Sequence, residues 1–235
     1  KRGFPHCFPV DPESPLQFHP LMNRILTTHV GSLIRPPQLL QFIRLRQNGE
    51  PYDPAAYDSC LKAAVAEVVG RQAQAGIDLP SDGEFGKSIS WSQYALERLS
   101  GFERRPARPG EHGSTRGADR ARFADFYREL DAADGPPAQV GTTAGQAVCV
   151  GPVAYTGQDE IRRDIANFKA ALAQAGLAQG FLPVAAPSSV IPDRKNEHYQ
   201  SDEALLQAIA EAMRTEYRAI VDAGLLLQLD DARLA

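Results

Sequence analysis

Residues 27–33 (TTHVGSL) place polar side chains in a segment that otherwise has the apolar character of a short strand. A histidine and a serine in such a segment can bind a ligand if the strand end faces a cavity. They need no special role in a solvated loop, and His29 suits a hydrogen-bonded core position equally well. Two later apolar segments, residues 76–84 (GIDLPSDGE) and 224–231 (GLLLQLDD), also end in polar residues. This shared pattern makes the strand ends the candidate site.

Glu84 and Asp230 are the two carboxylates in this pattern with the clearest chemical use. Carboxylates can bind an ammonium group or transfer protons. The sequence SDGE is also a good turn by itself, which explains Asp82 without any ligand. Asp230 and its neighbour Asp231 could instead cap a following helix. Glu84 follows the turn and is harder to explain structurally.

The rest of the chain alternates short apolar runs with helical patterns, which predicts β-α-β units and a parallel sheet. Strands are expected at residues 25–30, 76–84, 146–155, 180–187 and 224–231. Helix signals include Asp53 as a cap and Gly76 as a stop. In a β/α barrel the carboxyl ends of the strands meet at the active site. A doubly wound sheet is also open from the pattern alone, although neither a dinucleotide-binding nor a P-loop motif is present.

Composition describes an ordinary globular chain of 235 residues with 43% hydrophobic residues and a formal charge of -4. The chain has no excess of basic residues, so neither nucleic acid nor an anionic membrane surface is an expected partner. No apolar run approaches the length of a membrane span. Three cysteines without a C-x-x-C motif favour a reducing, cytoplasmic location. Of these, Cys149 lies in an apolar strand and is expected to be a small core residue.

Domain organisation is expected to consist of an irregular, proline-rich arm at residues 1–21 and a β/α domain at residues 22–235. Residues 101–145, rich in Arg, Gly, Pro and Ala, are expected to form an insertion with a helix near residues 121–130. Insertions of this length commonly serve as lids or mobile loops.

Five segments together resemble the cobalamin-independent methionine synthase family. They are TTHVGSLIRP, GIDLPSDGEFGK, GPVAYTGQDE, NEHYQSDEALLQAIAEAMRTEY and DAGLLLQLDD, in this order along the chain. The resemblance covers residues 22–235 and is strongest to the single-barrel branch that includes methionine-synthase-like proteins and epoxyalkane:coenzyme M transferase. It implies a TIM-type (β/α)8 barrel fold, of which this chain would contain about the first five β-α units.

The resemblance also implies a function, zinc-dependent methyl or alkyl transfer to a thiol. In this chemistry the metal favours the thiolate, which attacks the alkyl donor. The implied partners are a homocysteine-like thiol and a methyl or alkyl donor, as in 5-methyltetrahydrofolate–homocysteine methyl transfer. The implied substrate-binding residues are His29, Val30, Gly31, Ser32, Glu84 and Asp230. Two carboxylates suit an ammonium group, whereas the sulfonate of coenzyme M would need cations.

The family's zinc ligands, a His-x-Cys pair and a later cysteine, have no counterpart in this chain. We therefore assign no metal ligand, although His29, Glu84, Cys149 and Asp230 are of types that could form a substitute site. A catalytically silent fragment that binds a small molecule or a partner chain is the main alternative. Another is a metal-free barrel enzyme with Glu84 as its base. Because five strands cannot close a barrel, we expect either that a partner, such as another copy in an oligomer, covers the open sheet edge or that the chain is a truncated product.

Overall fold

The computed structural model describes residues 25–88, 93–105, 122–133, 146–190 and 194–231. The helices are α1 (Pro37–Asn48), α2 (Pro54–Gln74), α3 (Gln93–Glu97), α5 (Ala124–Ala133), α6 (Gln158–Gln174), α7 (Pro187–Val190) and α8 (Asp202–Asp222). The strands are β1 (Phe102–Arg105), β2 (Gln146–Cys149), β3 (Phe181–Ala185), β4 (Arg194–Asn196) and β5 (Leu226–Asp230). Helices and parallel strands follow one another along the chain, as predicted for an α/β fold.

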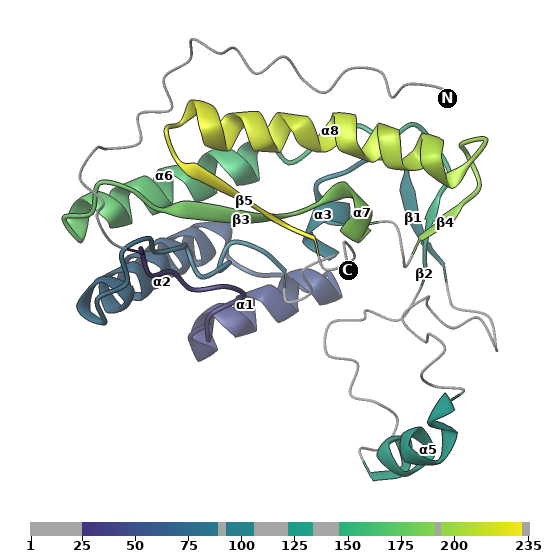
Figure 1. Ribbon diagram of the computed structural model, residues 1–235, viewed down its shortest axis with the longest axis horizontal. Coiled ribbons are helices and arrows are strands. Elements are labelled where there is room, and N and C mark those ends of the chain that lie inside the picture. The colour runs from purple at the N-terminus through teal and green to yellow at the C-terminus, as the bar shows by residue number, and fades with distance from the viewer. Residues whose placement is uncertain (1–24, 89–92, 106–121, 134–145, 191–193, 232–235) are drawn as a thin grey trace.

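A row of parallel segments carries the candidate site. Strand β3 pairs with β5 in parallel, from Phe181 opposite Leu226 to Ala185 opposite Asp230, and Figure 1 shows the two side by side with α8 along them. Single parallel bridges from Ser81 to Phe181 and from Thr28 to Leu79 extend the row. Four of the five predicted strand segments therefore lie in this row in chain order. Their carboxyl ends lie at the same edge.

The remaining predicted strand lies elsewhere. Strand β2 pairs antiparallel with β1 and parallel with β4 in a separate sheet of three strands. The expected count of about five barrel units is therefore not confirmed. The apolar residues of β2 are buried, as predicted, but burial alone does not determine which strand is the partner.

Strand β1 lies at the start of the segment expected to be an insertion, and helix α5 lies within it. The rest of that segment, residues 106–121 and 134–145, is outside the described residues, as is the expected arm at 1–21. The division into arm, domain and insertion stays a prediction.

Both ends of α2 and the start of α8 follow local sequence signals. Asp53 caps α2 because its Oδ1 accepts hydrogen bonds from the Ala55 and Ala56 amides at 2.9 and 3.2 Å. Gly76, just past the end of α2, has a φ of 81°, a conformation that glycine adopts without strain. Ser201 caps α8 through the Ala204 amide at 3.1 Å. The cap at Asp53 and the stop at Gly76 are confirmed as the boundaries of α2.

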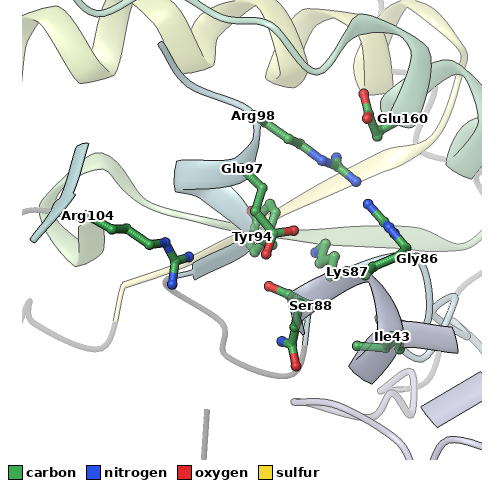
Figure 2. A pocket seen from close by; sticks show the side chains of 11 residues that line it. Ile43, Gly86, Lys87, Ser88, Tyr94, Glu97, Arg98, Arg104 and Glu160 are labelled. Carbon is green, nitrogen blue, oxygen red and sulfur yellow. The ribbon is translucent and has the colours of Figure 1, made fainter. Parts of the chain in front are cut away.

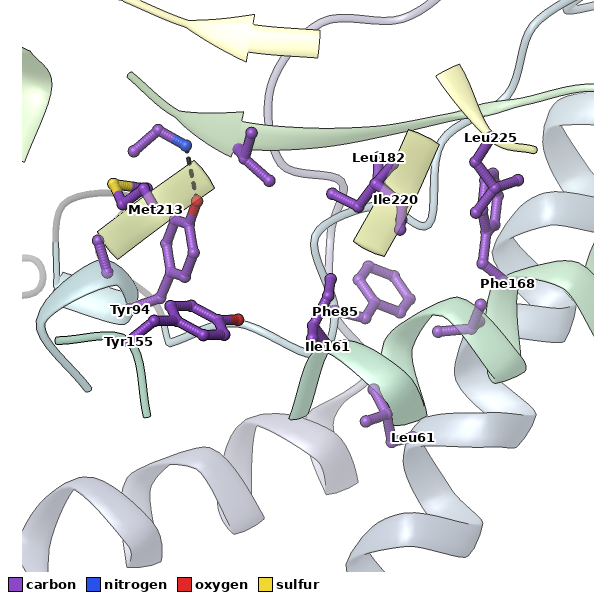
Figure 3. Close-up of a cluster of buried hydrophobic side chains, with 14 of the residues drawn as sticks. Leu61, Phe85, Tyr94, Tyr155, Ile161, Phe168, Leu182, Met213, Ile220 and Leu225 are labelled. Carbon is purple, nitrogen blue, oxygen red and sulfur yellow. Dashed lines mark hydrogen bonds between the residues drawn. The ribbon is translucent and has the colours of Figure 1, made fainter. Parts of the chain in front are cut away.

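The hydrophobic core fills the space between the helices and the parallel row. Helix α2 packs against α6, and α6 packs against α8. Figure 3 shows Phe85, Phe168 and Ile220 among the buried side chains. In the same view the Tyr94 hydroxyl of α3 accepts a hydrogen bond from the Ala185 amide at 2.6 Å. This bond fixes the end of β3 against α3.

Two further findings concern burial and membranes. Cys149 is fully buried within the core, which confirms its interpretation as a core residue. Within the described part of the chain, no helix is both long enough and apolar enough to cross a membrane.

Candidate functional site

Glu84 has a left-handed backbone, with a φ of 61°, which is uncommon for a residue with a side chain. Two hydrogen bonds hold the turn in this conformation. Asp82 Oδ1 accepts from the Glu84 amide at 2.9 Å, and Ser81 Oγ accepts from the Gly83 amide at 3.2 Å. Strained backbone of this kind persists where surrounding contacts enforce it, and it is common at functional sites.

The segment after the first parallel bridge holds Glu84 from the other side. The buried Arg35 guanidinium donates to the Glu84 carbonyl at 2.7 Å, and Ser32 Oγ donates to Glu84 Oε2 at 3.0 Å. The Leu33 amide also donates to the Gly83 carbonyl at 3.2 Å. The structure thus joins two of the predicted site residues, Ser32 and Glu84, directly.

Asp230 lies on the same small cavity as Glu84. The other residues that line this cavity are Lys87, Tyr94, Pro183, Val184 and Ala185. Its volume is about 10 Å³, close to the minimum that a water molecule needs. Next to it, the Asp231 carboxylate accepts hydrogen bonds from the hydroxyls of Ser188 at 2.7 Å and Ser189 at 3.3 Å. The two predicted site residues therefore line a common space at the strand ends.

Three other predicted residues do not reach this space. Val30 is 68% exposed and Gly31 is also exposed, while His29 is half-buried. His29 Nε2 lies 2.9 Å from the Gly31 carbonyl oxygen, within its own segment. These three residues line neither this small cavity nor the larger one beside it. The structure brings together Ser32, Glu84 and Asp230, and residues 29–31 lie outside this group.

Asp82 and Lys87 are two buried ionisable residues of the same loop that were not predicted to belong to the site. Removal from water raises the pKa of Asp82 to about 6, and the attraction of the nearby Lys87 ammonium partly opposes this effect. Lys87 donates from Nζ to the Pro183 carbonyl, and Nζ lies 4.6 Å from the centre of the Tyr94 ring. The sequence contained one signal for Lys87, because this lysine lies three residues after Glu84 in a segment already expected to bind a ligand.

A larger cavity of about 410 Å³ adjoins the small one, and Lys87 and Tyr94 line both. Figure 2 shows these two side chains beside each other on its wall, with Arg98 and Arg104 on neighbouring elements. Arg98 is neutralised, because it donates to Asp164 at 2.5 Å and to Glu216 at 2.9 Å. A volume of this size is typical of small-molecule sites.

Zinc binding is not supported by the described residues, which contain no group of three or more His, Cys, Asp or Glu side chains placed to hold a metal ion. Cys149 could have joined His29, Glu84 and Asp230 in a substitute site, but its side chain belongs to the core. Burial also raises the pKa of the Cys149 thiol, which disfavours the thiolate that zinc binds. The hypothesis of a substitute zinc site is therefore wrong for these four residues.

Comparison with known proteins gives a consistent result, although no family model matches the chain. A methionine synthase from Saccharolobus islandicus is 23% identical over 209 residues, which cover 88% of this chain and 53% of that protein. A methionine synthase from Sulfolobus acidocaldarius is 38% identical over 77 residues, which are 33% of this chain and 22% of the relative. The chain thus spans at most about half the length of these two curated relatives.

Solved structures agree on the fold. A B12-independent methionine synthase from Shewanella sp. W3-18-1, in complex with selenomethionine, superimposes with a TM-score of 0.58 at 18% identity. The match covers 87% of this chain and 51% of that protein. Over most of its length, at low identity, this chain is similar to the B12-independent methionine synthases.

Proposed function

We propose that this chain binds the amino-acid part of a homocysteine-like thiol and takes part in methyl or alkyl transfer to its sulfur, as in methionine synthases. The observation that carries the proposal is the shared cavity of Glu84 and Asp230, with Glu84 held in a strained backbone by Arg35 and Asp82. The similarity to methionine synthases supports the choice of substrate.

The chemistry of the cavity favours a cationic group at its mouth. Glu84 and Asp230 can each accept a hydrogen bond from an ammonium group, and such charge-assisted bonds are about twice as strong as neutral ones. A sulfonate thiol such as coenzyme M lacks this ammonium and would meet two carboxylates instead. Homocysteine is therefore the preferred acceptor, with a methylated folate as the implied type of donor.

The sulfur chemistry is not assigned to the described residues. Zinc dependence follows from the resemblance, but these residues do not fit a zinc ion. Binding and orientation of the amino acid are the contributions that this part of the chain can make. A second candidate function, a catalytically silent chain that only binds the thiol, is favoured by the same lack of clustered metal ligands.

Calorimetric titration with L-homocysteine under reducing conditions tests the proposal. We expect Glu84→Gln to weaken binding about tenfold or more, because a hydrogen bond to a charged group contributes roughly 1.5–3 kcal/mol. Glu67→Gln, in an exposed ion pair on α2, is the matched control and should leave the affinity unchanged. Equal affinity of the Glu84 variant and the wild type, or tighter binding of coenzyme M than of homocysteine, contradicts the assignment.

A further inference from the structure

Lys87 has a side chain whose burial the proposed function does not yet explain. It is only 6% exposed, and its described contacts are the Pro183 carbonyl and the Tyr94 ring. Among the described residues it forms no ion pair, although Asp82 is near enough to be influenced by its charge. Burying an ammonium group is costly unless an anion compensates it. Because burial of this ammonium group costs free energy, we expect Lys87 to have a function.

The position of Lys87 suggests that reason. It is the only cationic side chain among the described residues that line the small cavity, where Glu84 and Asp230 supply two negative charges. Arg35 contacts the backbone of Glu84 and is not part of the lining. The carboxylate of an α-amino acid is bonded to the same carbon as its ammonium group. A ligand whose ammonium binds the two carboxylates therefore brings its own carboxylate close to them.

Glu84 and Asp230 would repel the carboxylate of the ligand unless a cation lay beside it. Lys87 can supply this cation, because it lines both the small cavity and the larger one that adjoins it. Its present acceptor, the Pro183 carbonyl, is neutral. A ligand carboxylate in its place would form a charge-assisted bond of about twice the strength.

We propose that Lys87 binds the carboxylate of the amino-acid thiol, and so selects α-amino acids over simple aminothiols. This inference rests on the proposed function and adds a specificity-determining residue to it. The requirement for an anion at Lys87 and a cation at Glu84 and Asp230 describes a zwitterionic ligand.

Two ligands separate the roles of these residues. L-Homocysteine carries thiol, ammonium and carboxylate, whereas aminopropanethiol is the same molecule without the carboxylate. We expect wild-type protein to bind homocysteine about tenfold or more tightly than aminopropanethiol. Lys87→Met, which keeps the length of the side chain and its contact with Tyr94, should remove this preference. Its affinity for aminopropanethiol should stay within about threefold of the wild type.

Further variants complete the experiment. Lys87→Arg retains a cation and should restore part of the preference, while Lys62→Met, on the exposed face of α2, should change nothing. If Lys87→Met keeps the wild-type preference, or weakens both ligands equally, the Lys87 proposal fails although Glu84 can still bind the ammonium group. If wild-type protein binds neither thiol, the proposed function fails and the Lys87 proposal fails with it.

Discussion

At the scale of single residues, the loop at residues 81–88 concentrates charges where water is excluded. Asp82, Glu84 and Lys87 are all buried, and Arg35 is buried against them. Removal from water also lowers the pKa of Arg35, an effect that the charges of Glu84 and Asp82 oppose. A stable fold gains little from burying such groups, since apolar residues of similar volume commonly serve as well. Their presence here is better explained by binding than by stability.

Asp82 should make the stability of the fold depend on pH. Its folded pKa of about 6 lies above the ordinary 3.8, so the folded state holds the proton more tightly than the unfolded state. The stability associated with this proton is present at low pH and is lost as the pH rises through about 6. Asp82→Asn cannot ionise, so its stability relative to the wild type should rise by roughly 2 kcal/mol between about pH 4 and about pH 7.

Urea unfolding of both proteins at about pH 4 and about pH 7 measures this difference. Asparagine keeps the oxygen that accepts from the Glu84 amide, so the turn should remain intact. A difference in unfolding free energy that stays constant between the two pH values contradicts the burial argument.

Sequence reasoning grouped Glu84, Asp230 and Ser32 because each carries a polar group at the end of an apolar run, and in the structure these three lie together. It missed Arg35 and Lys87, whose burial depends on how distant segments pack around them. It also grouped residues 29–31 with Glu84 and Asp230, whereas these three do not line the small cavity. The polarity of a segment does not reveal which side of it faces a cavity. The sequence shows which residues are polar or charged, but it does not show in which direction a side chain points.

At the scale of elements, the buried Arg98 joins three helices. It lies just after α3 and donates to Asp164 of α6 and to Glu216 of α8. The end of α2 and the start of α8 were predictable from the capping residues, because caps act within a few positions of the chain. The partners of β2 were not predictable, since an apolar strand fits any buried sheet. Arg98 is separated from its two partners by 66 and 118 positions along the chain. Long-range contacts of this kind determine which strands and helices pack together.

Replacing Arg98 should destabilise the whole fold. Arg98→Met leaves two buried carboxylates without their cation, and we expect it to lower the free energy of unfolding by about 3–5 kcal/mol. Arg71→Met is the matched control, because Arg71 pairs with Glu67 on the exposed surface of α2. A surface pair of this kind contributes about 0–1 kcal/mol. Urea unfolding compares the two variants, and equal losses would contradict a structural role for the buried cluster.

At the scale of the whole molecule, the row of parallel segments ends in two apolar edges. Ile25, Val30 and Ile34 are exposed at the first segment, and Leu226 and Leu229 are exposed on β5 at the other end. Among the described residues, β5 pairs only with β3, and the first segment forms a bridge only to the segment that contains Leu79. Exposed apolar strand edges of this kind favour association with another chain.

Association through β5 leads to a prediction about oligomeric state. We expect the purified chain to self-associate, because one edge of β5 has no partner strand among the described residues. Pairing there would satisfy its backbone groups and cover Leu229, which is 51% exposed. Leu229→Lys should shift the protein towards monomers, since a charged side chain at a strand edge opposes pairing. Val221→Lys is the matched control, because Val221 is 55% exposed but lies on helix α8. Light scattering coupled to gel filtration measures the mass of each variant across a range of concentrations. A monomeric wild type, or the same shift in both variants, would show that β5 is not the interface.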